Sequence, residues 1–442
     1  MFANIFYPFK AIISSYLRIP LFVRILISFF LGAGLGIIFS FLPKDNIHPV
    51  IEIIKPFGTA LISMLKMIVF PIIFFSLILG AASLPLKKAG KLGGAVIGWY
   101  LVTSVFATMF GIFIALLLNP TMRAYNDVAV TFQSGISSHV LSEDISRKGF
   151  SDFITNLFQN PFYALTNGDF LSIIVFAILV GLASRVVLDS AKVSDSEQNS
   201  VQSFLNVCGG CQIVSFKIID WIVQYFPIGI FALTFTNFSV SGLELFAPYL
   251  RIILCVVVGT VGMVVLVYPL GIWFFCRENP YILLWRLKLP IITAFTTRSS
   301  AATLSVSIKV QDKMGVSSSL SSFSLPLGCT INMDGVCVHL PVFVILASNI
   351  FGTPVTPYGL LVLLVSVVLA SIGAGGIPGG SVFLLFMILE NAGFSAEQVT
   401  GIVGLALGVN PLLDMFETAC NVTGDNVCTY IVAKRNGLIA VK

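Results

Sequence analysis

The stretch Asp414–Lys434, DMFETACNVTGDNVCTYIVAK, decides how the rest of the chain is interpreted. Read as a helix, it has a polar stripe at i, i+3, i+4, i+7 and i+11, formed by Asp414, Glu417, Thr418, Asn421 and Asp425. The flanking sequence is apolar enough for a membrane, where such groups cost several kcal/mol unless they are paired or hold a ligand. A polar contact between two helices is the simpler explanation. Because the stripe carries three carboxylates, it favours a bound cation or polar ligand instead.

Composition places this helix in a polytopic membrane protein. The 442 residues are 57% hydrophobic and only 10% charged, whereas soluble domains carry about 25% charged residues. The net charge of +5 does not indicate nucleic-acid binding, because Lys and Arg cluster in short connections, where they set topology. The eight cysteines lie mostly in apolar runs, and the three histidines show no metal-ligand spacing.

Hydropathy and length divide the first two thirds of the chain into six spans. A basic amphipathic helix at the membrane surface is expected over residues 1–19. Lys66, in the second span, is expected to snorkel or to pair. The predicted spans and loops are spans at about 20–43, 50–84 and 89–118, an external loop at 120–149, a span at 150–187 broken at Asn160-Pro161 and Asn167-Gly168, an internal loop at 189–200, a span to about 238 kinked by Pro227, and a span at 246–276.

The pattern changes after residue 290, where small and polar residues interrupt every apolar run. Two segments, centred on Thr297–Thr303 and on Ala370–Ser381, have apolar arms on both sides of a small-residue tip. This pattern is typical of re-entrant hairpins, because non-helical backbone at membrane depth is tolerated only where it lines a cavity or site. Two such segments in related positions indicate a transporter site.

A third irregular stretch, Gly328-Cys-Thr-Ile-Asn-Met-Asp-Gly335, lies between them. In a continuous helix Asn332 and Asp334 would point about 200° apart. The bracketing glycines predict local unwinding, which would let backbone carbonyls converge with the Asn and Asp oxygens. Hard oxygen ligands suit Na⁺ or another hard cation. An unwound stretch that merely packs is the alternative.

The predicted fold class is an all-α polytopic membrane protein. Both termini are basic at the membrane edge, so both are expected in the cytoplasm, which requires an even number of full spans. Eight transmembrane helices plus two re-entrant hairpins, entering from opposite sides as an inverted repeat, satisfy the basic loops.

At these motifs the chain resembles the glutamate-transporter family, which comprises excitatory amino-acid transporters, neutral amino-acid exchangers and prokaryotic dicarboxylate or amino acid:cation symporters. The matching motifs are Thr297-Arg-Ser-Ser300, Asn332-Met-Asp-Gly335, Gly375-Gly-Ile-Pro-Gly379 and Asn421-Val-Thr-Gly-Asp425. The resemblance implies a homotrimer with an elevator mechanism, gated by the second hairpin. It implies a scaffold part over residues 1–88 and 120–240, which includes the external loop, and a transport part over residues 89–119 and 241–442.

The resemblance also implies coupling to three sodium ions. The first would be held by Tyr100, Thr103 and Ser104 with Asn332 and Asp334. The second would use Asp425 and carbonyls near Gly328, Asn332, Met333 and Asn421. The third would use Thr330 and the carbonyls of Ser371, Ile372 and Ala374.

The substrate site carries over in part. The resemblance implies that Asp414 binds the substrate amino group, that Asn421, Ser300 and the second-hairpin backbone bind the α-carboxylate, and that Thr418 supports them. The other residues expected around the substrate are Arg298, Ser299, Val336, Gly376, Ile377, Ser381 and Glu417.

Two positions depart from members that bind acidic substrates. These members have Arg where this chain has Glu417, and commonly Thr where it has Val336. Because like charges about 4 Å apart cost on the order of 1–4 kcal/mol, glutamate or aspartate is not the expected substrate.

Three interpretations of Glu417 stay open. It pairs with the cationic side chain of a basic or diamino substrate such as Arg, Lys, ornithine or cystine, which the reversed charge favours. Alternatively it pairs with Arg298 and leaves a site for neutral Ser, Ala, Thr, Cys or Gln. In the third interpretation it is protonated and donates a hydrogen bond.

The sequence therefore predicts a sodium-coupled amino-acid symporter or exchanger in the inner (plasma) membrane. A channel would need a selectivity filter around an axis, and an enzyme would need a nucleophile–base or metal constellation. The sequence shows neither pattern, so no enzymatic activity is expected. The expected partners are the amino acid, Na⁺, the lipid bilayer and two further copies of the chain, with no nucleic acid.

Overall fold

The computed structural model describes residues 19–83, 90–118, 155, 157–167, 170–353, 355–372 and 379–440. Within these ranges the chain is all-helical, and eight helices or helix runs are long and apolar enough to cross a membrane. The predicted fold class is confirmed to that extent. The longer elements are α2 (Leu21–Ser40), α3 (Lys44–Ala82), α4 (Gly90–Leu118), α9 (Phe170–Asp189), α10 (Asp195–Ser241), α11 (Phe246–Gly262), α12 (Tyr268–Cys276), α16 (Ser318–Ile331), α17 (Asp334–Phe351) and α20 (Ala396–Arg435).

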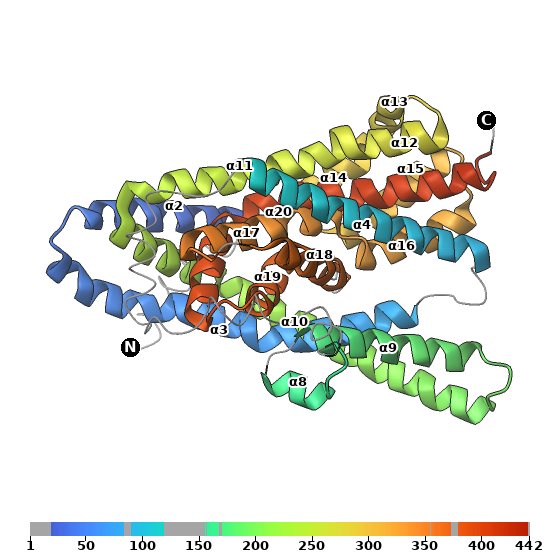
Figure 1. Cartoon of the computed structure of the whole chain (residues 1–442), viewed down its shortest axis with the longest axis horizontal. Coiled ribbons are helices and arrows are strands. Elements are labelled where there is room, and N and C mark those ends of the chain that lie inside the picture. Colours follow the sequence, from blue (N-terminus) through green and yellow to red (C-terminus); the bar gives the residue numbers. More distant parts are fainter. Residues whose placement is uncertain are drawn as a thin grey trace, which may run out of the picture.

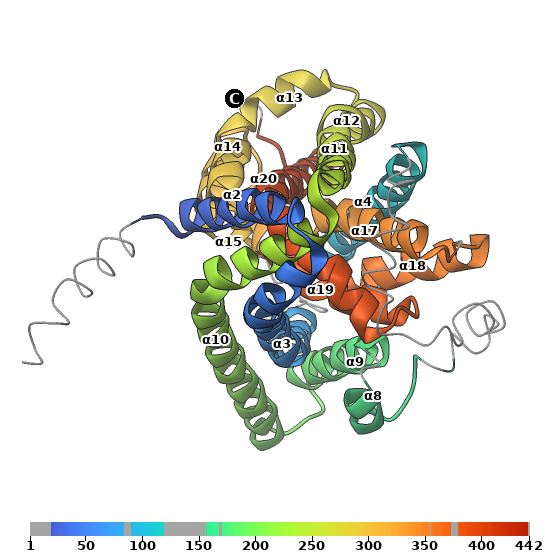
Figure 2. The ribbon, with the colours of Figure 1, turned by 90° about the vertical axis from the view of Figure 1, so that its left-hand side faces the viewer.

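The helices form two groups, which Figures 1 and 2 show from the side and from one end. In the first group, α10 packs along α2 and α3, and α9 packs on α3. Its buried side chains are mostly apolar, with Leu61 and Leu65 of α3 and Phe235 of α10 all at most 2% exposed. Gly36 lets α2 approach α10, because a Cβ there would lie 2.7 Å from the Cβ of Phe238.

The second group is arranged around α20. In Figure 2 this helix lies in the middle, beside α11, α14 (Lys288–Thr297) and α17, and it also contacts α4, α12, α16 and α19 (Gly380–Asn391). A capping box between Ser395 and Gln398 starts α20, and Lys434 and Arg435 in its last turn complement the helix dipole. The helix is therefore well defined at both ends and enclosed between them.

The remaining helices are short and flank the irregular segments. They are α8 (Pro161–Asn167), α13 (Pro280–Arg286), α15 (Ser300–Lys313) and α18 (Pro357–Ser371). The tip between α14 and α15 is tight, and Arg298 there adopts a left-handed conformation with φ 53°. The tip between α18 and α19, at 373–378, lies outside the described residues. The re-entrant paths, the inverted repeat and the two-part division stay predictions.

Several predicted boundaries change. The internal loop predicted at 189–200 is shorter, because α10 already begins at Asp195, where Ser194 and Glu197 form a capping box. The fifth span is one helix that continues through Pro227. Helix α8 ends at Asn167 and α9 begins at Phe170, and the predicted break between them falls on residues 168–169, outside the described residues. Lys66 does pair, with its Nζ 3.2 Å from Glu390 of α19.

The sixth span contains one turn of π-helix. Residues Met263–Val267 form this turn between α11 and α12. A π turn contains an extra residue and weakens the local hydrogen-bond ladder. Tyr281 of α13 donates its hydroxyl to the Val265 carbonyl at 3.3 Å, so this carbonyl has a partner from outside the span.

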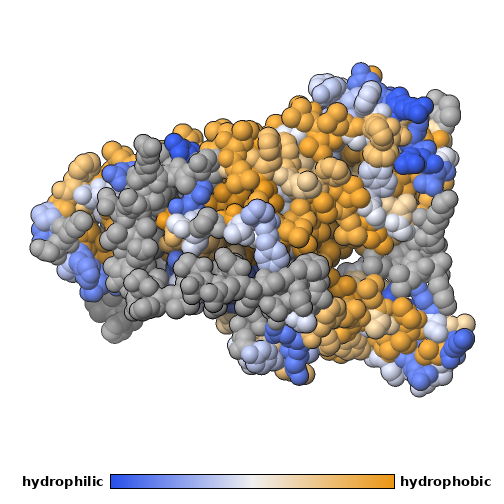
Figure 3. All heavy atoms as spheres, in the orientation of Figure 1, coloured by the Kyte–Doolittle hydropathy of each residue, from blue (hydrophilic) through white to orange (hydrophobic). Residues whose placement is uncertain are grey.

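The described surface is consistent with a bilayer. Hydrophobic residues predominate along the length of the molecule in Figure 3, and hydrophilic residues gather towards its ends. The amphipathic helix expected at 1–19 lies almost entirely, and the loop expected at 120–149 entirely, outside the described residues. The cytoplasmic location of both termini stays a prediction.

Candidate functional site

The predicted break between Gly328 and Gly335 is present but short. Helix α16 ends at Ile331 and α17 begins at Asp334, so that Asn332 and Met333 lie between them with non-helical backbone. Gly328 lies inside α16, where a Cβ would come within 2.8 Å of the Tyr100 hydroxyl. The break turns the Asn332 side chain and the first turn of α17 into the space between α4 and α20.

Residues of α4 meet this break as the sodium prediction required. Thr103 Oγ1 donates to Asn332 Oδ1 at 3.1 Å, and Ser104 Oγ donates to Asp334 Oδ1 at 3.3 Å. Tyr100 is adjacent but engaged elsewhere, since its hydroxyl donates to the Ser324 carbonyl at 2.8 Å. The structure therefore brings Thr103 and Ser104 together with Asn332 and Asp334.

Asp425 of α20 joins the same cluster. It accepts a hydrogen bond from Asn332 Nδ2 at 3.0 Å, and all of these side chains are buried. Gly424 allows this packing, because a Cβ there would lie 2.6 Å from Asp334 Oδ2 and from the Tyr268 hydroxyl. Two carboxylates, an amide and two hydroxyls thus converge in a water-poor interior, which suits a hard monovalent cation.

Tyr268 is a member of the cluster that the sequence did not predict. Its hydroxyl donates to Asp334 Oδ2 at 2.8 Å and also lies 3.2 Å from the Cys420 carbonyl. The only sequence signal is a tyrosine inside an otherwise apolar span. This signal is weak, because a tyrosine at such a position is also typical of the membrane interface.

The third predicted ion site is only partly described. Thr330 and Ser371 each donate to a carbonyl of their own helix, of Leu327 at 2.8 Å and of Val368 at 2.9 Å. Ile372 follows directly, and Ala374 lies outside the described residues. Across the described part of the chain, no group of three or more His, Cys, Asp or Glu is placed to hold a metal ion.

The predicted substrate residues lie along the preceding turns of α20. Asp414 Oδ2 accepts from the Gly379 amide at 3.2 Å and lies 4.0 Å from Arg298 Nη1. Asn421 Oδ1 accepts from the Gly335 amide at 2.6 Å, which leaves its NH₂ group for another acceptor. Asp414 thus contacts the tips of both helix pairs.

The other substrate residues are placed as follows. Ser299 caps α15 by accepting from the Ala302 amide, and the Ser300 hydroxyl is buried without a described hydrogen-bond partner. Thr418 donates to the Asp414 carbonyl, and Ser381 donates to Asn410. Val336 is 4% exposed on α17. Gly376 and Ile377 lie outside the described residues.

Glu417 has an unexpected partner. Its Oε1 lies 2.5 Å from Nδ1 of His339 on α17, and the two side chains are 2% and 0% exposed. The atoms are in contact, although their angle is not that of a standard hydrogen bond. The predicted pair between Glu417 and Arg298 is not formed, since Arg298 lies against Asp414. The spacing of the three histidines does not indicate a metal site and therefore does not mark His339. Its position one turn after Gly335, on the face towards α20, was the available signal.

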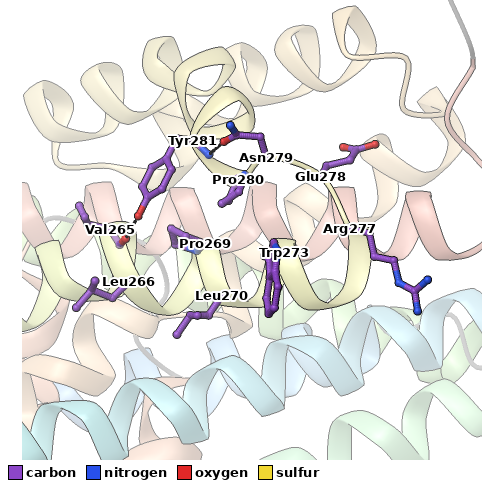
Figure 4. A pocket seen from close by; sticks show the side chains of 10 residues that line it. All are labelled: Val265, Leu266, Pro269, Leu270, Trp273, Arg277, Glu278, Asn279, Pro280 and Tyr281. Atoms are coloured by element: carbon purple, nitrogen blue, oxygen red, sulfur yellow. Dashed lines mark hydrogen bonds between the residues drawn. The ribbon is translucent and has the colours of Figure 1, made fainter.

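An open cavity of about 650 Å³ lies away from this cluster, beside α12 and α13 (Figure 4). Its lining is mainly apolar, with Trp273 and Leu270 on one side and Tyr281 on the other. None of the predicted site residues lines it. The polar cluster is instead closed and filled by its own side chains, as expected where buried polar groups satisfy one another.

Comparison with known proteins agrees with this geometry. The model of the sodium:dicarboxylate symporter family matches residues 21–435. The serine/threonine transporter SstT of Bifidobacterium adolescentis is 29% identical over 94% of this chain and 90% of its own length. The SstT protein of Acinetobacter baylyi is also 29% identical, over 93% of this chain and 96% of its own. The neutral amino acid transporter B(0) of Bos taurus is 32% identical over 83% of this chain and 71% of its own.

The family match covers almost all of the described helices, including both sides of the polar cluster. The relatives are transporters and not enzymes. The chain therefore belongs to the sodium:dicarboxylate symporter family and is a sodium-coupled amino-acid transporter of the membrane.

Proposed function

We propose that this transporter carries small neutral amino acids, such as serine, threonine or alanine, together with Na⁺. The observation that supports this most directly is the contact between Glu417 and His339. The acid at the position that reads the substrate side chain already has a buried partner within the protein. The names of the similar proteins, which carry serine, threonine or neutral amino acids, agree with this class.

A cationic side chain, which the sequence favoured, fits this arrangement less well. To reach Glu417 it would have to displace His339 from a contact that is nearly inaccessible to water. Removing one partner from a buried pair leaves an uncompensated charge, which is strongly unfavourable. An acidic side chain fits no better, because Glu417 would repel it and Val336 offers no hydrogen-bond donor.

The backbone groups of the substrate would be held by the residues around Asp414. The substrate ammonium would take the place of Arg298 beside Asp414, since that ion pair is loose at 4.0 Å. The NH₂ group of Asn421 would bind the α-carboxylate, supported by the buried Ser300 hydroxyl. Both contacts use groups that the described structure leaves weakly engaged.

Sodium would couple to substrate through α20 and α17. Asn421 receives the Gly335 amide, and the next residue before Gly335 is Asp334 of the cation cluster. A cation that fixes Asp334 and Asn332 therefore also fixes the part of α17 that positions Asn421. Because binding energies are linked reciprocally, Na⁺ would tighten substrate binding and substrate would tighten Na⁺ binding.

The wider mechanism is part of the same proposal. We expect three sodium ions per substrate, a gate at the tip between α18 and α19, and elevator movement of residues 89–119 and 241–442 against residues 1–88 and 120–240. We also expect a homotrimer in the plasma (inner) membrane with both termini in the cytoplasm. Exchange of internal for external substrate is compatible with this arrangement.

Uptake into proteoliposomes tests the proposal. Radiolabelled serine, threonine, alanine, lysine, ornithine and aspartate are offered with an inward Na⁺ gradient and with choline in place of Na⁺. We expect Na⁺-dependent uptake of serine, threonine or alanine at least about tenfold above lysine and aspartate, which corresponds to about 1.4 kcal/mol of discrimination. Na⁺-dependent uptake of lysine or ornithine in preference to serine would overturn the neutral class and restore the cation-reading role of Glu417.

A further inference from the structure

We propose that His339 is a specificity-determining residue, which acts through Glu417 to make the side-chain end of the substrate pocket electrically neutral. This inference rests on the proposed function and deepens it, because it names the group that turns an acidic position into a site for uncharged substrates. His339 itself is a positioning residue, since it lies behind Glu417 and needs no contact with the substrate.

The way α17 and α20 pack against each other brings His339 and Glu417 together. A Cβ on Gly335 would lie 2.7 Å from the Glu417 Cα, so α17 and α20 meet backbone to backbone at this glycine. His339 follows Gly335 by one helical turn and thus faces α20. The Gly335 amide also donates to Asn421, which fixes the rotation of α17 at the same point.

The pocket around the imidazole offers Glu417 as its polar neighbour. The ring is 0% exposed and stacks on Phe343, with ring centroids 4.7 Å apart and an angle of 26°. Neither ring nitrogen has a standard hydrogen bond within the described part of the chain. A buried imidazole without such a bond is costly, so its contact with the carboxylate is the interaction that compensates it.

The charged groups around His339 and Glu417 can be named individually. With one proton between them, the imidazole and the carboxyl group carry no net charge, whichever of the two holds it. Asp414 lies one turn earlier on α20, and its charge is faced by Arg298 from the tip between α14 and α15. The thiol of Cys420, on α20, is a further titratable group that interacts with Glu417. In the proposed arrangement, contact with His339 therefore keeps the side-chain end of the pocket neutral.

The carboxylates of Asp414 and Glu417 differ in how readily a substrate group can reach them. The partner of Asp414 is Arg298, whose side chain is 19% exposed and lies at a tip. The partner of Glu417 is fully enclosed between two long helices. A substrate ammonium can therefore exchange with Arg298, whereas a substrate side chain meets a carboxylate that is already compensated.

The experiment is a double-mutant cycle of His339→Phe and Glu417→Gln, with uptake of serine and of lysine measured for each form. Phenylalanine keeps the ring that stacks on Phe343 and removes both nitrogens. We expect H339F to lower serine uptake and to raise the lysine-to-serine ratio at least about tenfold, because the carboxylate is then unpaired. We expect H339F/E417Q to return this ratio to within about threefold of the unmodified protein, because neither charge remains.

The ratio separates this role from a merely structural one. A variant that only folds poorly loses serine and lysine uptake by the same factor, whereas an altered charge changes the ratio. The matched control is His48→Phe, because His48 forms an exposed pair with Glu52 at 3.5 Å on α3, where both side chains are more than two thirds exposed. This control is expected to leave the ratio unchanged.

The outcomes for the two proposals differ. An unmodified protein that prefers lysine overturns the neutral class. An unmodified protein that prefers serine, together with an H339F ratio unchanged within about twofold, overturns the role of His339 and leaves the neutral class standing. Independent, additive effects of H339F and E417Q also overturn the role of His339, whichever substrate is preferred.

Discussion

Helices α10 and α20 are the two longest helices in the described part of the chain, with 47 and 40 residues, and each continues through an internal proline. They differ in what they bury. Two buried hydroxyls of α10 bond within their own helix, as Ser215 does to the Cys211 carbonyl and Thr234 to the Ile230 carbonyl. Several buried polar groups of α20 instead have partners outside the helix, as Asp425 has in Asn332 and Asn426 in Ser307.

This difference between α10 and α20 indicates which helix contributes to the ion and substrate sites. A helix such as α10, whose buried Ser215 and Thr234 hydroxyls bond to its own backbone, packs on apolar neighbours such as Leu61 and Leu65 of α3. In α20, Asp425 needs Asn332, Asp414 needs Arg298, and Glu417 needs His339. A buried polar group that relies on another helix destabilises the fold when its partner is absent. Each such contact is also a place where an ion or a substrate group can replace the partner.

The strongest test of the comparison replaces one acid in each region. Asp334→Asn removes the carboxylate that accepts from Ser104 and Tyr268, and we expect it to lower Na⁺-dependent uptake by a factor on the order of 100 or more. Asp220→Asn on α10 removes an exposed acid paired with Lys217 at 3.7 Å, and we expect a change of less than about twofold. The effect of both variants is measured as uptake into proteoliposomes at a series of Na⁺ concentrations. If D334N kept its Na⁺-dependent uptake, Asp334 would not be a ligand of the cation.

A smaller effect is expected from the hydroxyl that supports Asp334. Tyr268→Phe keeps the ring and removes one charge-assisted hydrogen bond of 2.8 Å. We expect the Na⁺ concentration for half-maximal uptake to rise about tenfold, since such a bond contributes about 1.5–3 kcal/mol. The matched control is Tyr249→Phe, a buried tyrosine of α11 that stacks on Phe238. Equal effects of both variants would show that the loss is not specific to the hydrogen bond from Tyr268 to Asp334.

The smallest effect is expected where α20 leaves the membrane. Burial alone would raise the pKa of Glu278, but hydrogen bonds from Lys434 and Tyr430 outweigh it, so that its pKa lies below the ordinary value of 4.5. This pairing therefore stabilises the fold above that ordinary pKa, and the contribution is lost as pH falls through the lower pKa of the folded state. Because the side chains of Lys434 and Glu278 are 40% and 36% exposed, we expect less than about 1 kcal/mol.

The melting temperature at pH 7 and at pH 4 measures this contribution. Glu278→Gln is expected to reduce the difference between the two values by a few degrees at most. A difference that E278Q leaves untouched would assign the acid sensitivity to other groups.

Much of the fold could be predicted from periodicity, because apolar length and the polar stripe are local properties of the sequence. The stripe from Asp414 to Asp425 and the break at Asn332 are both confirmed as local structure. Partner choice is not local. His339 and Tyr268 lie on helices whose rotation is set by close packing at Gly335 and by the π turn, and neither feature has a periodic signature.

The start of α10 shows the opposite error. Residues 195–200 are polar, which predicts a loop, yet they form the first turns of a helix that extends beyond the apolar region. Hydropathy reports where a helix is buried in lipid, and it does not report where hydrogen bonding begins. The capping box at Ser194 and Glu197 carries that information.

The π turn at Met263–Val267 has a consequence for the geometry of the whole sixth span. One extra residue in a turn rotates everything after it by about 100° relative to a continuous α-helix. Tyr268 is the first residue after this phase change, and its hydroxyl meets Asp334. The same residues wound as a continuous α-helix would have the same hydropathy and would still cross the bilayer, but Tyr268 would be rotated by about 100° and would point away from Asp334. The bilayer sets the length of this span, and the cation cluster sets its phase.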